Sequence, residues 1–240
     1  MAKRELQEIN AGSMADIAFL LLVFFLVTTT VEMEAGISRT LPVKLDNTKL
    51  PPPPPVNARN IFSIQVNSQD ALRVENQPIL LEELEEKTRD FYLANAVAET
   101  NPELAKYNPV SRQTVNAEMT EVMKNIENST GAFKAVFEGE KRKLEKKLLV
   151  LDVVGNSYME IDKTAVIQLK NNAGTSYGMY IQIQDVLKKV IEDLRREKAE
   201  ELGWTYSEID WSKEASEEDQ KKAEVLKVLV PERIIESKIK

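Results

Sequence analysis

The chain has 240 residues, of which 42% are hydrophobic and 30% are charged. Its 32 Lys and Arg residues against 39 Asp and Glu residues leave a net charge of -7, which argues against a nucleic-acid binder because such proteins carry basic surfaces. Histidine and cysteine are absent, which excludes a His-based triad, a thiol nucleophile and a Cys/His zinc site. No phosphate-binding loop, Gly-x-Ser-x-Gly elbow or calcium loop is present. We therefore expect no enzymatic activity, no catalytic residue, no metal site and no nucleic-acid partner.

An apolar run lies close to the N-terminus. From Ala15 to Val31 the only charged residue is Asp16. A membrane-spanning helix needs about 20 largely apolar residues, and residues 14–33 supply them if the charged residues lie near the two ends. We predict a transmembrane helix over residues 14–33, after a short segment of residues 1–13.

A cleaved signal peptide would also place basic residues, here Lys3 and Arg4, before an apolar run. Residues 28–36 offer no convincing pair of small residues for cleavage, and a carboxylate inside the run is unexpected for a signal peptide. The orientation of the helix is weakly encoded, because basic residues lie within 20 positions on both sides of it.

Residues 34–59 are predicted to be a proline-rich linker. The five consecutive prolines from Pro51 to Pro55 favour polyproline II, a semi-rigid spacer of about 3.1 Å per residue. A ligand for an aromatic groove is the alternative interpretation of this run.

Residues 60–240 are predicted to fold as a small two-layer α+β domain. Alternating apolar residues indicate a β-hairpin over residues 62–74, and a helix with Leu81, Leu84, Thr88 and Phe91 on one side follows it. Later patterns predict a strand over residues 164–170, a helix that begins near Ser176 and ends at Gly203, a helix over residues 214–226 and a short apolar pair at the end.

The segment of about residues 95–160 differs in character and is predicted to be a helical insertion. Its apolar periodicity predicts two helices, one through Val115 and Ile126 and one through Phe133 and Leu148. The lysine-rich stretch of residues 141–147 alternates with glutamates, so a solvated helix face with ion pairs is favoured over an anion-binding surface.

Asp16 is the residue to which chemistry can be assigned. A carboxylate at mid-membrane costs about 2.5–3.5 kcal/mol, and less near an end. It can snorkel to the interface, or it can act as a proton site because desolvation raises a carboxylate pKa. At 100° per residue its helix face is small and polar at the N-terminal part, which suits packing against a partner. The residues on that face are Gly12, Ser13, Leu20, Val23, Val27 and Thr30.

The run from Asn10 to Thr29 resembles the transmembrane signature of the ExbD/TolR biopolymer-transport family. Asn10 lies six residues before the aspartate as in that family, and Ser13 stands where the family commonly has proline. Leu41 and Pro42 match the Leu-Pro of the family after the helix. Tyr177 and Gly178, with the strand and helix around them, are similar to its outer domain.

The resemblance implies a motor subunit of the bacterial inner membrane, with a cytoplasmic N-terminus and a periplasmic linker and domain. Asp16 would carry protons, the coupling ion, with no other cofactor. The implied partners are an ExbB-like polytopic protein, expected in five copies, a second copy of this chain, and a TonB-like periplasmic protein whose outer-membrane transport the motor energises.

Two alternatives stay open at this point. The motor can serve TolR-like envelope maintenance or motility instead of TonB-dependent transport. The chain can also be a bitopic anchor that does no proton work and whose outer domain only binds other molecules.

Overall fold

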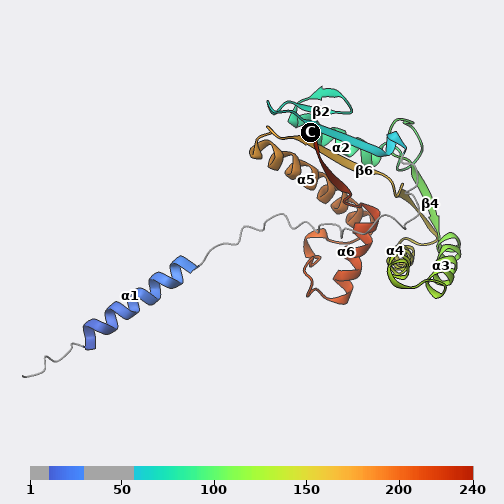
Figure 1. Cartoon of the computed structure of the whole chain (residues 1–240). Helices are drawn as coiled ribbons and strands as arrows, with labels where there is room; N and C mark the ends of the chain where they lie inside the picture. The colour runs from blue at the N-terminus through green and yellow to red at the C-terminus, as the bar shows by residue number, and fades with distance from the viewer. Residues whose placement is uncertain (1–10, 30–56, 240) are drawn as a thin grey trace, which may run out of the picture. The chain divides into compact units, whose positions relative to one another are not determined.

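The computed structural model describes residues 11–29 and 57–239 (Figure 1). The chain divides into two compact units, residues 1–49 and 50–240, and each is described by itself. In the first unit, helix α1 covers Ala11–Thr29. The remainder of the predicted span, residues 30–33, and the predicted linker up to residue 56 lie outside the described residues.

A mixed sheet of five strands organises the second unit. Its order is β3-β2-β1-β6-β7, with β3 antiparallel to β2, β2 antiparallel to β1, and β6 parallel to both β1 and β7. The strands cover Ile61–Val66 (β1), Leu72–Val74 (β2), Gln77–Ile79 (β3), Val166–Asn172 (β6) and Ile234–Ile239 (β7). The predicted α+β class is confirmed for this unit, as are the β-hairpin of β1 with β2 and the strand β6.

One face of the sheet carries the core, because buried and half-buried residues alternate along β1 and β6. Phe62 lies opposite Ile167, and Ile64 opposite Leu169, in the parallel register. Helices α2 (Leu81–Leu93) and α5 (Tyr177–Glu201) cover this face and contact each other (Figure 1). The helix predicted to begin near Ser176 is confirmed as α5. The buried apolar residues of its inner face are Ile183, Leu187, Val190, Ile191 and Leu194.

The segment between α2 and β6 forms a second small layer. Strand β4 (Tyr107–Ser111) pairs antiparallel with β5 (Ser157–Ile161), and between them lie α3 (Arg112–Glu127) and α4 (Gly131–Val154). We call α3 and α4 the helical hairpin. The two helices agree with the prediction, whereas the two-stranded sheet at their base was not predicted. The amide of Asp162 donates to the carbonyl of Lys106 at 2.8 Å, so the segment leaves the core beside the point where it enters.

The C-terminal part returns to the sheet through α6 (Glu217–Leu229) and β7. Gly203 follows the end of α5 with φ of 74°, a left-handed conformation that glycine adopts without a Cβ penalty. Helix α6 begins and ends three residues later than the predicted helix over residues 214–226. The final apolar pair belongs to a six-residue edge strand, and the short strand β3 was missed.

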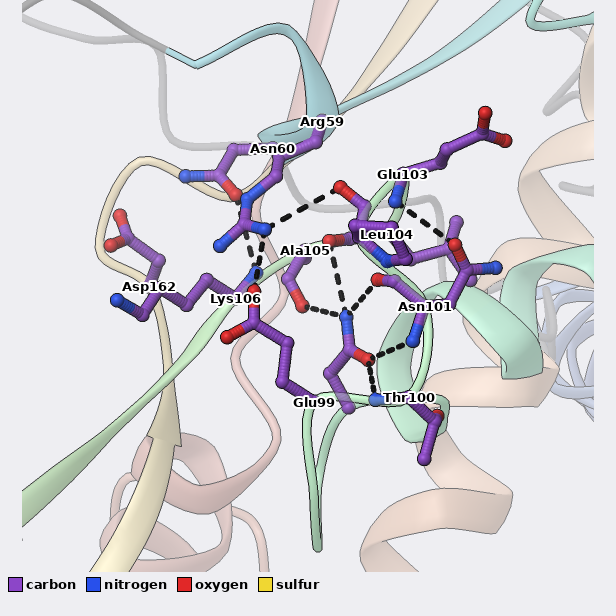
Figure 2. A network of polar contacts seen from close by, with 12 residues as sticks. Arg59, Asn60, Glu99, Thr100, Asn101, Glu103, Leu104, Ala105, Lys106 and Asp162 are labelled. Carbon is purple, nitrogen blue, oxygen red and sulfur yellow. Dashed lines mark hydrogen bonds and ion pairs between the residues drawn. The ribbon is translucent and has the colours of Figure 1, made fainter.

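The loop after α2 is held by one side chain. The amide group of Asn95, which is 3% exposed, donates to the carbonyls of Asn101, Leu104 and Ala105 at 2.7–3.2 Å. It accepts from the backbone amides of Thr100 and Asn101 at 3.0 and 2.9 Å. Figure 2 shows these polar contacts together with Arg59, which binds Glu99 at 2.7 Å. The loop is therefore fixed from inside and tied to the start of β1.

Candidate functional site

Helix α1 carries one ionisable side chain, that of Asp16. Its neighbours along the described helix are apolar and exposed, with Phe19 and Phe24 showing 63% and 60% of their surface. An apolar surface of this size needs lipid or protein to cover it. Whether lipid or protein covers α1, the Asp16 carboxylate would therefore lie in largely apolar surroundings.

The helical geometry of α1 brings part of the predicted site together. Asp16, Leu20, Val23 and Val27 lie at successive spacings of four, three and four residues, so their positions share one face of the helix. Gly12 and Ser13 lie in the first turns of the same helix. Asn10 and Thr30, the other predicted members of this face, lie outside the described residues.

Among the residues that the structure describes, none of the helices combines the length and the apolarity required to cross a membrane.

The Tyr177-Gly178 pair begins helix α5. The Ser176 hydroxyl accepts from the amide of Met179 at 3.1 Å and caps the helix as predicted. Tyr177 itself is 77% exposed. The first residue of α5 therefore presents an aromatic ring to the surroundings from a capped, rigid helix start.

The turn between β1 and β2 fixes this helix start from the other side. The Asp70 carboxylate accepts from the amide of Ser176 at 2.9 Å, and this bond lowers the pKa of Asp70. Thr175 donates its hydroxyl to the carbonyls of Val66 and Asn67 at 3.3 and 3.1 Å. A Cβ on Gly174 would lie 2.6 Å from the Cβ of Ser68, so the loop can approach the turn this closely only with glycine there.

A polar cluster connects the same helix to the edge strand β7. Tyr180 donates to the Glu236 carboxylate at 2.7 Å, and Gln184 donates to the same oxygen at 3.0 Å. The ring centroids of Tyr177 and Tyr180 lie 6.3 Å apart. The Tyr177-Gly178 position is thus linked to both the β1–β2 turn and β7.

Sequence analysis did not identify Asp70 or Glu236 as neighbours of Tyr177 and Gly178. Residues 67–70 lie inside the predicted β-hairpin, and nothing in the pattern indicates which helix they meet. Leu41 and Pro42, the predicted site residues after the membrane helix, lie outside the described residues. Within the described residues no group of Asp and Glu side chains is arranged to hold a metal ion.

A comparison with protein-family models matches residues 2–195 to the family described as "Biopolymer transport protein ExbD/TolR". The match includes α1 with Asp16, the sheet strands β1 and β6, the helical hairpin and most of α5. Searches of curated proteins and of solved structures gave no match.

Proposed function

We propose a function for this chain from the premise that it belongs to the ExbD/TolR family of biopolymer transport proteins. The chain is a motor subunit that couples the proton motive force to TonB-dependent outer-membrane transport, together with an ExbB-like channel partner. In this proposal α1 and the residues after it form a single-pass helix of the bacterial inner membrane. The N-terminus is cytoplasmic, and the linker and the α+β domain are periplasmic.

The observation that carries the proposal is the isolation of Asp16 on α1. It is the only ionisable group of α1, and the side chains that follow it along the described helix are mostly large and apolar. A charge in such a place is costly and needs a partner to enclose it. Gly12 and Ser13, one turn before it, allow another helix to approach closely. A carboxyl group that is neutral while it moves through lipid-like surroundings and charged at the two ends of its path is suited to carry protons.

The energy available to such a group is sufficient for mechanical work. Each proton that crosses the membrane contributes about 2.3 kcal/mol per 100 mV. Several successive protonations of Asp16 can therefore drive a conformational step in a helix that the partner surrounds. Five copies of the ExbB-like subunit around two copies of this chain are the assembly that we propose.

The capped helix start at Tyr177 and Gly178 is the proposed output region of the periplasmic domain. Its position is fixed by the Asp70–Ser176 bond and by the Glu236 cluster. A force applied at Tyr177 would therefore reach the sheet through hydrogen bonds rather than through a loose loop. A TonB-like protein is the proposed recipient. Tol-type machinery is the second candidate because the family description names TolR beside ExbD, and motility machinery is a further alternative.

Substitution of Asp16 tests the motor. Asp16→Asn keeps the size and polarity of the side chain but cannot ionise, so we expect normal expression, normal co-purification of the ExbB-like partner and no TonB-dependent uptake. Asp16→Glu keeps the charge but moves it by one methylene, and we expect at most partial uptake. Glu127→Gln, which removes an exposed carboxylate of α3, is the matched control and should leave uptake unchanged.

If the chain is only an anchor, both Asp16 substitutions will be silent. Uptake by the Asn variant at normal expression would therefore refute the motor function. The identity of the co-purified membrane protein distinguishes TonB-type from Tol-type and motility output.

A further inference from the structure

The chain enters the α+β unit through one turn of 3-10 helix, η2 (Ala58–Asn60), directly before β1. Any pull that α1 exerts on this unit along the backbone must therefore pass through this turn. The proposed output region at Tyr177 follows β6. Because β1 and β6 are parallel, the entry lies at the starts of these two strands and the output lies beyond their ends. A pull between the two points therefore loads β1 along its length.

The start of β1 is the end that meets such a load first. In the register with β6, β1 is paired from Ile61 opposite Val166 to Val66 opposite Asn171. In the register with β2 it is paired only from Ile64 onwards. Within the described part of the chain, the first residues of β1 therefore have a strand partner on one side only. Without a further attachment, a pull on the preceding residue would separate them from β6 pair by pair.

Asn60 supplies an attachment at this end. Its side chain is 4% exposed, donates to the hydroxyl oxygen of Thr164 at 2.7 Å and accepts from the backbone amide of Lys106 at 3.3 Å. The Thr164 hydroxyl in turn donates to the Asp162 carboxylate at 2.7 Å. One buried side chain thus joins the residue before β1 to the segment before β6 and to the entry of the inserted segment.

Two arginines extend this connection. Arg59 donates to the Glu99 carboxylate at 2.7 Å and to the carbonyl of Pro102 at 3.4 Å, in the loop after α2 (Figure 2). Arg233, directly before β7, donates to the carbonyl of Asp162 at 2.6 Å. The starts of β1, β6 and β7 are therefore connected at one end of the sheet by side-chain hydrogen bonds, in addition to the bonds between the strands.

We infer that Arg59 and Asn60 form a force-bearing clamp, which stops β1 from separating from β6 at its loaded end when α1 pulls on the α+β unit. While the clamp holds, β1 and β6 can separate only by sliding past each other, so the pairs along the whole register share the load. The clamp thereby passes the pull to the end of the sheet at which Tyr177 lies. The inference rests on the proposed motor function, since it is the motor that would exert the pull.

Constant-force optical trapping of the full-length chain in detergent tests the clamp. The chain contains no cysteine, so Asn57→Cys with Tyr177→Cys provides two unique and exposed points for DNA handles. Unfolding under force reports the unfolding rate. Asn60→Ala removes two hydrogen bonds of the clamp, and at a fixed force it should unfold about 5- to 30-fold faster. Arg59→Ala should have a smaller effect, because its ion pair with Glu99 is half exposed.

Two controls separate the clamp from an ordinary loss of stability. Ser216→Ala removes the N-cap of α6, which lowers stability away from the start of β1, and should leave the rate between the first pair of handles unchanged. A second pair of handles, Gln77→Cys with Glu217→Cys at exposed positions, loads β3 and α6 instead. With this pair, Asn60→Ala should change the unfolding rate by less than about twofold. Urea unfolding of each variant gives its equilibrium stability.

The inference is overturned if Asn60→Ala leaves the rate between the first pair of handles unchanged, if it accelerates unfolding equally with both pairs, or if Ser216→Ala has the same effect. The measurement needs neither a proton gradient nor a partner. Its outcome is therefore independent of the uptake assay with Asp16→Asn, so failure of the clamp and failure of the motor function can be told apart.

Discussion

The side chain of Asn95 gives the sharpest test of how the α+β unit of residues 50–240 is held together. It is 3% exposed and makes five hydrogen bonds with the backbone of residues 100–105. Asn95→Ala leaves at least two carbonyls and two amides of that loop without their partner. At a net contribution of about 1 kcal/mol for each bond, four lost bonds predict a destabilisation of about 2–4 kcal/mol, reduced where water enters the space.

Urea unfolding of residues 59–240, followed by far-UV circular dichroism, measures this loss. Asn101→Ala is the matched control, because the side chain of Asn101 accepts only from the amide of Glu103 at 2.9 Å. We expect it to cost about 1 kcal/mol or less. Hydrogen exchange of the amides of Thr100 and Asn101 should also accelerate in Asn95→Ala, since the loop can open locally.

Asn95→Asp separates hydrogen bonding from packing. The second oxygen would face three carbonyl oxygens, so burial and repulsion would raise the pKa of the new carboxyl group above its value in the unfolded chain. A group whose folded-state pKa is raised is destabilising when ionised, and the loss of stability should therefore shrink as the pH falls towards 4. A cost below about 1 kcal/mol for Asn95→Ala, with unchanged exchange, would refute this account of the loop.

Three further predictions follow from the described residues. Residues 59–240 should unfold cooperatively as an isolated domain, because α2 and α5 already cover one face of the sheet, and a non-cooperative urea transition would contradict this. The isolated domain should also be a dimer, as the implied second copy of the chain requires, and a monomer in sedimentation would contradict that. Gly203→Ala should cost about 1 kcal/mol in urea unfolding, because φ of 74° is unfavourable for a residue with a Cβ. Gly139→Ala in α4 should not destabilise, because a Cβ added there would meet open space. Burial raises the pKa of Asp162, but hydrogen bonds from Thr164 and Asn108 outweigh it and leave the pKa below its ordinary value. The ionised form therefore stabilises the fold above the unfolded-state pKa, and this is lost as the pH falls through the folded-state pKa. Asp162→Asn should accordingly flatten the decline of stability in acid, and an unchanged pH profile between 2.5 and 6 would show that the carboxylate makes no such contribution.

Local periodicity explains which elements could be predicted from the sequence. Phe62, Ile64 and Val66 alternate within six residues, and the stripe of α5 repeats over three turns, so each signal is complete within one element. Strand β3 contains Pro78 and only three residues, which leaves no alternation to detect. Strands β4 and β5 are paired across the whole helical hairpin, and Pro109 interrupts the pattern of β4.

The residues of the candidate site also differ in whether the sequence alone could predict them. Asp16 is conspicuous in the sequence because one charge interrupts an apolar run. The contact of Asp70 with Ser176 joins residues 106 positions apart, and no property of either segment alone indicates the other. Tyr177 and Gly178 were found only through the resemblance to a family, and the structure adds the neighbours that hold them.

The adjoining ends of the inserted segment have a consequence for how the chain can vary. Because the amide of Asp162 reaches the carbonyl of Lys106, the backbone leaves and rejoins the sheet domain at nearly one point. Each doubling of the length of the segment that closes there costs the sheet domain only about 0.6 kcal/mol more, since loop-closure entropy grows logarithmically with length. Lys106 and Asp162 are therefore a natural splice point, at which the inserted segment can change in length without a change of register in β1 or β6.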